Sequence, residues 1–339
     1  MAGPLPVVVS GIQPSGPLHL GNYLGAIRQN VEMANDPARR SEAFLFIVDY
    51  HALTTLRDAQ ALRRYTLDVA LDYLALGLDP DRAHLFVQSD VPALGELTWI
   101  FLTLTPTSLL EKGVSYKDKV AQGLAANGGL LTYPILQAAD ILAYTAPGHG
   151  LVVPVGADQK QNLEISRDTA ARFNQAFRAG DDPLFPLPEP HILDEVSTIP
   201  GLDGRKMSKS YGNTVGIFDE GPALKKKVMS IVSDSTPLEA PKDPDADHTF
   251  ALIRHFATDA ERDEIAAAYR AGGYGYGHAK KALIGLIDRH FAEARERRRE
   301  LAARPDHVRQ ILQAGAQAAR ARSAEVMREV RDAVGFLNA

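Results

Sequence analysis

The chain has 339 residues, of which 45% are hydrophobic and 23% charged, and its formal net charge at pH 7 is −5. This composition provides enough apolar residues for a large core, and the length suggests two domains or one large domain with an appendage. The absence of cysteine excludes disulfides and thiolate-ligated metal centres, and it fits a reducing cytoplasm. The N-terminus lacks the features of a signal peptide, and no run approaches the roughly 20 apolar residues that span a bilayer. We therefore expect a cytoplasmic protein.

The first half of the chain alternates between short apolar runs and segments with a helical period. The runs are typical of strands buried on both faces and cover residues 6–9, 44–48, 85–87 and 151–155. Helices are expected between them, because apolar residues recur every three or four positions from Leu20 to Val31 and over residues 63–78. Strand, helix and strand at this spacing predict a parallel sheet. Ligands of such sheets bind at the carboxyl ends of the strands, where Ser10-Gly11 and Asp49-Tyr50-His51 fall.

Beyond residue 213 the pattern becomes mainly helical. Helices are expected over residues 223–232, 250–257, 259–271, 278–302 and 306–334. Gly272 and Gly273 separate two of them. The fold class is therefore α/β, with a Rossmann-type parallel sheet followed by a helical region.

Charge is unevenly distributed in this helical region. Residues 280–339 contain 13 Lys and Arg against 8 Asp and Glu, a local charge of +5 that leaves −10 for the remainder. Arg295, Arg297, Arg298 and Arg299 concentrate the positive charge. These arginines form either a solvated helix face with ion pairs four residues apart or a surface that faces phosphate groups.

Two segments stand out as candidates for chemistry. GIQPSGPLHLGN, from Gly11 to Asn22, lies between a predicted strand and a helix, where backbone N–H groups can face phosphate. It is neither a P-loop nor GxGxxG, so by itself it is equally a plain strand–helix turn. KMSKS, from Lys206 to Ser210, carries two ammonium groups on mobile stems, which suit a leaving group of high negative charge. Alone, it is more simply an exposed polar loop.

Together these segments resemble the two signature motifs of class I aminoacyl-tRNA synthetases, with His19-Leu20-Gly21-Asn22 in the form that the tryptophanyl branch uses. Further segments similar to bacterial tryptophanyl-tRNA synthetases are residues 48–52, 131–142, 153–161, 172–174 and 273–275. The resemblance covers nearly the whole chain. It implies that tryptophan and ATP give tryptophanyl-adenylate and pyrophosphate, and that the amino acid then passes to the 3′ end of its tRNA.

The resemblance also implies the site residues. ATP would be held by Gln13, Pro14, Ser15, Gly21, Asn22, Lys119, Gly156, Ala157, Asp158, Lys206, Met207, Ser208, Lys209 and Ser210. The expected catalytic residues are His19, Asn22, Lys206 and Lys209, and the two lysines would neutralise the departing pyrophosphate with the help of Mg²⁺. No protein nucleophile is needed, because the carboxylate of the substrate attacks the α-phosphorus. No side chain is assigned as a metal ligand.

The tryptophan pocket is expected to contain Asp140, Tyr133, Gln159, His51, Gln137, Val153 and Val155. Asp140 is the expected selectivity residue, because an indole N–H only donates and a buried acceptor distinguishes it from a phenyl ring. From the residues alone, Asp140 equally suits a helix cap or an arginine partner, and His51 equally suits the core. Gln137 stands where many relatives have methionine, which makes the pocket wall more polar.

We predict a Rossmann-type catalytic domain over residues 1–211 and a helical domain that binds the tRNA anticodon over residues 212–339. The resemblance implies a homodimer, with its interface in a helical segment at about 93–149. The alternatives are a tyrosyl-tRNA synthetase, a non-catalytic RNA-binding paralogue and a nucleotidyltransferase without tRNA. The GIQPSG string favours the tryptophan branch, the intact His19, Asn22 and lysines favour catalysis, and the basic C-terminal region favours RNA.

Overall fold

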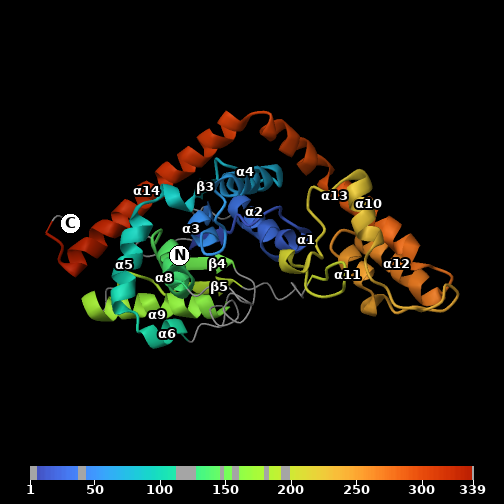
Figure 1. Ribbon diagram of the computed structural model, residues 1–339, viewed down its shortest axis with the longest axis horizontal. Coiled ribbons are helices and arrows are strands. Elements are labelled where there is room, and N and C mark those ends of the chain that lie inside the picture. Colours follow the sequence, from blue (N-terminus) through green and yellow to red (C-terminus); the bar gives the residue numbers. More distant parts are fainter. Residues whose placement is uncertain are drawn as a thin grey trace, which may run out of the picture. The chain divides into compact units, whose positions relative to one another are not determined.

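The computed structural model describes residues 6–36, 43–111, 127–145, 149–154, 160–178, 183–191 and 199–337. Its five strands are β1 (Val7–Ile12), β2 (Ala43–Ile47), β3 (Ala83–Val87), β4 (Leu151–Pro154) and β5 (Glu189–His191). Neighbouring strands are parallel, in the order β3-β2-β1-β4-β5 (Figure 1). This is the strand order of a Rossmann-type sheet, so the predicted fold class is confirmed. The order reverses between β1 and β4, and ligands of such sheets bind beside that point.

The strands are buried as their apolar runs predict. Val7, Val8 and Val9 of β1 and every residue of β2 are buried. Gly11 follows this run, and a larger residue would not fit there without a shift, because a Cβ would lie 2.7 Å from the ring of Phe46. The edge strand β5 has the sequence Glu-Pro-His and no apolar run, so its pattern did not predict it.

Helices surround the sheet. In this part of the chain they are α2 (Arg28–Asn35), α3 (Asp49–Ala52), α4 (Ala59–Ala75), the short 3₁₀ helix η2 (Gln88–Asp90), α5 (Ala93–Leu104), α6 (Thr107–Glu111), α8 (Gly128–Leu142), α9 (Lys160–Phe177) and α14 (Pro305–Val334). α5, α8 and α9 pack against one another, and α4 packs on β2. Edge-to-face contacts of Phe101, Phe173 and Phe185 join α5, α9 and the residues before β5.

The final helix, α14, covers the edge strand β3 (Figure 1). Gly315 allows this approach, because a Cβ there would lie 2.1 Å from the carbonyl oxygen of Leu85. Two nitrogens of Arg331 donate to the carboxylate of Glu96 at 2.8 and 2.5 Å, and Arg320 donates to the carbonyl of Asp90 at 2.8 Å. The edge of the sheet is thereby shielded from pairing with another chain.

The chain divides into two compact units. The sheet unit comprises Met1–Gly16, Gln29–Leu193 and Leu301–Ala339, and the second unit comprises Pro17–Arg28 and Asp194–Glu300. Helices that lie wholly or mostly in the second unit are α1 (Leu20–Asn22), the π-helix η1 (Tyr23–Ile27), the 3₁₀ helices η4 (Lys209–Tyr211) and η5 (Pro244–Ala246), α10 (Gly221–Met229), α11 (His248–Ile253), α12 (Asp259–Ala271) and α13 (Tyr276–Ala302). A functional boundary at residue 211 stays a prediction. None of the described helices is both long and apolar enough to cross a bilayer.

Many arginines of the basic C-terminal region have acidic partners. The pairs are Arg289–Glu261, Arg295–Asp288, Arg297–Glu293, Arg299–Glu296, Arg309–Asp306, Arg322–Glu325 and Arg331–Glu96. Arg295 is buried and also donates to the carbonyl of Asp219 at 2.5 Å. For these residues the arrangement favours the ion-paired alternative over a free basic surface.

Candidate active site

The carboxylate cluster, formed by Gln88, His51 and Asp140, lies where β2 and β3 end. Gln88 directly follows β3, and its Nε2 donates to both carboxylate oxygens of Asp140 at 2.8 Å. His51 lies in α3 beyond β2, and its Nε2 is 2.9 Å from Oδ2 of Asp140. Asp140 is 1% exposed and Gln88 is 0% exposed. The structure thus brings the predicted residues His51 and Asp140 together and adds Gln88, which the sequence analysis missed.

One face of α8 supplies the predicted tryptophan residues. Tyr133, Gln137 and Asp140 are spaced four and three residues apart, so they share a face of the helix. The rings of Tyr133 and His51 meet edge to face, with their centroids 6.0 Å apart. Gln137 is half-buried, and Val153 on β4 is buried in the core. The structure therefore links Tyr133 to the carboxylate cluster through His51.

An aromatic stack lies close to this cluster. The Tyr144 ring stacks on that of Phe44 with a centroid distance of 4.7 Å. Burial, and then the negative charge of Asp140, raise the pKa of the Tyr144 hydroxyl well above its ordinary value. Because the hydroxyl is buried without a hydrogen-bond partner among the described residues, it stays protonated and belongs to an apolar wall.

In the second unit, residues 17–22 of the first signature motif lie beside the second motif. The backbone N–H of Leu20 donates to the carbonyl of Val215 at 2.9 Å, and that of Ile217 donates to the carbonyl of Leu18 at 3.2 Å. A Cβ on Gly21 would lie 3.4 Å from the Cβ of Met207. Segments nearly two hundred residues apart are thereby joined by a short antiparallel pairing.

His19 lies within this pairing. Its backbone N–H donates to Oδ1 of Asn22 at 3.1 Å, and the residue is only 6% exposed. Burial, and then the charge of Lys209, lower the pKa of the imidazole to about 4. The imidazole is therefore neutral at pH 7, and its buried Nδ1 has no hydrogen-bond partner in the described part of the chain. Such an atom has unused capacity for a ligand.

The lysine loop, residues 206–210, is fixed by a buried amide. Oδ1 of Asn213 accepts from the backbone N–H of Ser208 at 2.8 Å. Its Nδ2 donates to the carbonyl of Lys206 at 3.1 Å and to Oδ1 of Asp203 at 2.7 Å. The hydrogen bond from Asn213, followed by contacts with Arg205, lowers the pKa of the Asp203 carboxyl. Asn213 was not among the predicted site residues.

The side chains of the lysine loop differ in exposure. Met207 is buried, Lys209 is half-buried, and Lys206 and Ser210 are exposed. Oγ of Ser208 accepts from the backbone N–H of Ser210 at 3.3 Å and starts η4. The loop thus combines a buried anchor and a fixed backbone with an exposed Lys206 ammonium group.

The remaining predicted residues fall at the end of β1 or outside the described ranges. Nε2 of Gln13 donates to the carbonyl of His51 at 3.4 Å. The backbone N–H of Ser15 donates to the carbonyl of Gln13 at 2.9 Å, Ser15 is exposed, and Pro14 is buried. Lys119, Val155, Gly156, Ala157, Asp158 and Gln159 lie outside the described residues, and their roles stay predictions.

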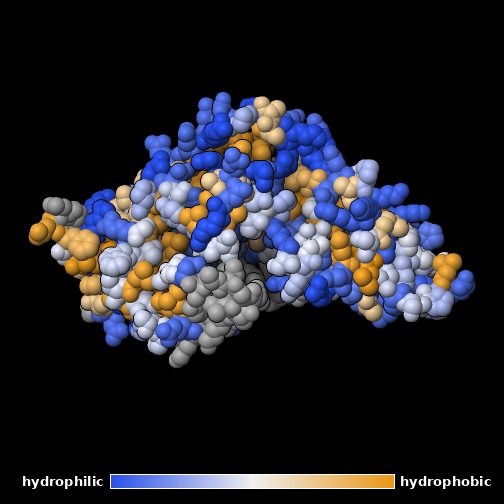
Figure 2. Space-filling model, in the orientation of Figure 1, coloured by the Kyte–Doolittle hydropathy of each residue, from blue (hydrophilic) through white to orange (hydrophobic). Residues whose placement is uncertain are grey.

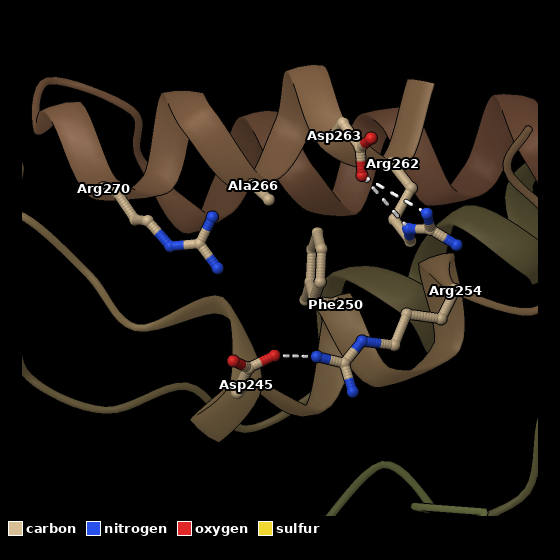
Figure 3. Close-up of a pocket in the computed structure, with 7 residues that line it drawn as sticks. All are labelled: Asp245, Phe250, Arg254, Arg262, Asp263, Ala266 and Arg270. Carbon is tan, nitrogen blue, oxygen red and sulfur yellow. Dashed lines mark hydrogen bonds and ion pairs between the residues drawn. The ribbon is translucent and has the colours of Figure 1, made fainter. Parts of the chain in front are cut away.

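The arginine hollow, a cavity of about 380 Å³, lies among η5, α11 and α12 (Figure 3). Arg262, Ala266 and Arg270 are spaced four residues apart on α12, and the small Ala266 leaves room between the arginines. Arg254 pairs with Asp245, and Arg262 pairs with Asp259 and Asp263. In the described part of the chain, Arg270 has no ion-pair partner. The lining residues are Asp245, Phe250, Arg254, Arg262, Asp263, Ala266 and Arg270.

Comparison with known proteins agrees with the fold and the paired motifs. The sequence pattern of a family described as "tRNA synthetases class I (W and Y)" matches residues 4–292. The chain therefore belongs to this class I synthetase family. Within it, tryptophan–tRNA ligases of Rhodopirellula baltica and Fusobacterium nucleatum are 50% and 47% identical over 329 residues, 97% of this chain and 99% and 98% of theirs.

A solved structure is also similar. The tryptophanyl-tRNA synthetase of Campylobacter jejuni, complexed with ADP and tryptophan, has a TM-score of 0.87 and 43% sequence identity. The alignment covers 97% of this chain and 99% of that chain. The likeness therefore extends over the sheet, the lysine loop and the C-terminal helices.

Proposed function

We propose that this protein is a tryptophan–tRNA ligase that works in the cytoplasm. It activates L-tryptophan with ATP to form tryptophanyl-adenylate and pyrophosphate, and then transfers tryptophan to the 3′ end of its tRNA. The observation that carries the choice of amino acid is the buried carboxylate of Asp140, held at the carboxyl ends of β2 and β3. Relatives named tryptophan–tRNA ligase, 50% and 47% identical over 97% of the chain, support it.

Asp140 would select tryptophan through its indole N–H. A buried carboxylate accepts such a donor, whereas phenylalanine would leave it without one. Tyr133 and Gln137 share a face of α8 with Asp140, which supports their assignment to the same pocket. Tyr133 and Gln159 would meet the ammonium and carboxylate of the substrate, and Val153 and Val155 would pack on its ring.

The second unit would handle the phosphates of ATP. A carboxylate oxygen of tryptophan forms a bond to the α-phosphorus while the bond to the bridging oxygen breaks, and pyrophosphate leaves with the electron pair. Lys206 and Lys209 would neutralise the charge that develops on this leaving group. The unpartnered Nδ1 of the neutral His19 supports a direct contact in which the tautomer with its proton on Nδ1 donates to a phosphate oxygen. Asp158 would accept the ribose hydroxyls.

Mg²⁺ would enter bound to the phosphate oxygens of ATP. Among the described residues, no group of three or more His, Asp or Glu side chains is placed to hold a metal ion. The motif side chains His19, Lys206 and Lys209 offer one neutral ring and two cations, a donor set that suits phosphate better than a bare cation. When bound, the ion would neutralise charge on the phosphate oxygens.

In the helical region predicted at residues 212–339, the part that lies in the second unit would bind the anticodon region of tRNA, and the arginine hollow is our candidate for a phosphate contact. A guanidinium group binds two oxygens of one phosphate at once. Figure 3 shows the guanidinium group of Arg270 to the left of the Phe250 ring and that of Arg254 below the ring. The absence of an ion-pair partner for Arg270 in the described residues supports this choice.

The protein would act as a homodimer through the segment at about 93–149. Trp99 on α5 is 68% exposed, and Phe336 and Leu337 at the end of α14 are 47% and 100% exposed. Figure 2 shows hydrophobic surface near α5 and the end of α14. Exposed apolar surface of this kind favours a protein interface.

Exchange between ATP and pyrophosphate, measured with tryptophan, tyrosine and phenylalanine side by side, tests activation. We expect exchange with tryptophan alone, and a loss of at least about a hundredfold in Asp140→Ala. Asp140→Asn serves as a same-shape control for the charge. Exchange with tyrosine would instead assign the chain to the other branch, and exchange with none of the three would refute the proposal.

Charging of tRNA completes the test. Arg262→Ala and Arg270→Ala are expected to raise the KM for tRNA several-fold and to leave tryptophan-dependent exchange unchanged. Arg297→Ala, which removes an arginine paired within α13, is the matched control. If the hollow variants charge tRNA like the wild type, the arginine hollow is not the tRNA contact.

A further inference from the structure

Gln88 fixes the accepting geometry of Asp140, and we propose that it is a positioning residue for recognition of the indole N–H. The inference rests on the proposed function, because it concerns the same pocket. Gln88 is 0% exposed and occupies the first position after β3, on the carboxyl edge of the sheet. It acts on the substrate through Asp140.

The orientation of the Gln88 amide follows from its partner on the other side. Oε1 of Gln88 lies 3.0 Å from the backbone nitrogen of Tyr50, which can only donate. The amide oxygen must therefore face Tyr50, and the NH₂ group must face Asp140. Oδ1 of Asp49 shares the Tyr50 N–H with Gln88 and also accepts from the backbone N–H of Ser89, each at 3.0 Å, so it ties the segment after β2 to the segment after β3. The ends of β2 and β3 thus hold the amide in one direction.

The contacts of Asp140 leave a defined accepting position. A carboxylate has about four accepting positions, two on each oxygen. Oδ2 faces Nε2 of Gln88 at 2.8 Å and Nε2 of His51 at 2.9 Å, whereas Oδ1 faces Gln88 alone at 2.8 Å. Among the described residues, one position on Oδ1 thus remains for a substrate donor. An indole N–H supplies one donor and no acceptor.

Without the Gln88 amide, Asp140 would keep a single side-chain contact, to His51, and its carboxylate would be free to rotate. The site is buried, so water would not readily restore the lost hydrogen bonds. If the carboxylate rotates, its free accepting position is less often aligned with the indole N–H, and the hydrogen bond is weaker on average. The loss would therefore fall on substrates that use the N–H and spare those that lack it.

The test compares tryptophan with the analogue in which sulfur replaces the indole N–H, β-(3-benzothienyl)alanine. The ratio of their kcat/KM values in pyrophosphate exchange is measured for the wild type, Gln88→Met and Gln88→Asn. Methionine has a similar length without the amide, and asparagine is one methylene too short to span Tyr50 and Asp140. Gln29→Met is the matched control, because Gln29 is also buried in the sheet unit and, among the described residues, makes no hydrogen bond to Asp140. The ratio does not depend on how much of each preparation is folded.

We expect the preference for tryptophan over the analogue to fall at least about tenfold in both Gln88 variants and to stay within about twofold in Gln29→Met. An equal loss for both amino acids, with an unchanged ratio, would show that Gln88 only supports the fold and would overturn the inference. An error in the proposed function would give a different result from an error in the role of Gln88. In that case the wild type itself would show no exchange with tryptophan or no preference over the analogue.

Discussion

The carboxylate cluster and the lysine loop are each fixed by a buried side-chain amide. One amide binds a side-chain carboxylate, whereas the other binds backbone groups. Gln88 binds the carboxylate of Asp140 itself. Asn213, which is 3% exposed, binds the backbone of the lysine loop at Lys206 and Ser208 and leaves the Lys206 side chain exposed. Selectivity requires the charged group itself to be fixed, because a hydrogen bond depends on direction. Neutralising a leaving group requires only a nearby charge, which a lysine delivers on a flexible stem.

The largest expected effect comes from removing the lysine charges. Lys206→Ala combined with Lys209→Ala should lower the rate of adenylate formation by about 10³-fold or more, because each cation stabilises charge that appears only in the transition state. Binding of tryptophan should change little. Single-turnover adenylate formation and equilibrium binding of tryptophan measure the two effects separately. Lys225→Ala with Lys226→Ala, two exposed lysines of α10, is the control, and an unimpaired rate in the lysine-loop variant would contradict the comparison.

His19 should make the stability of the fold depend on pH. Its pKa is about 4 in the folded protein against an ordinary value of 6.5, so the unfolded chain binds the proton more tightly. The stabilisation is fully present above pH 6.5 and is lost as the pH falls toward 4. It amounts to about 2 kcal/mol between pH 7.5 and pH 5.

Urea denaturation across this pH range, on the wild type and on His19→Asn, measures that contribution as a difference. The variant should lose less stability on acidification than the wild type. If the free energy of unfolding falls equally with pH in the wild type and in His19→Asn, the imidazole of His19 does not have a lowered pKa in the folded protein.

The family resemblance supplied Tyr133, Gln137 and Asp140, and the structure adds that they share a face of α8, which repeats every 3.6 residues. The residues themselves placed His51, because it follows the apolar run that predicted β2. The two buried amides had no such signal. A single glutamine or asparagine is not part of a repeating pattern in the sequence. Its burial depends on tertiary contacts, which the pattern does not predict. Gln88 had one usable clue, its position directly after a buried strand.

The sequence pattern also could not predict the pairing of segments that are far apart in the chain. Leu18 and Leu20 pair with residues 215–217 through backbone groups, which every residue type carries. The sequence predicted a helix over residues 306–334, but it did not predict that this helix would cover β3. Gly315 marks that contact only once the structure shows Leu85 against it.

The smallest expected effect, and the sharpest test of the comparison, is Asn213→Ala. This change leaves the backbone N–H of Ser208 and the carbonyl of Lys206 without the partners that fix them, while both lysine charges remain. Adenylate formation should fall only about tenfold, because each mobile ammonium group still reaches the leaving group part of the time. The preference for tryptophan over its sulfur analogue should not change. If that preference fell as it does in Gln88→Met, the two amides would not have separate roles.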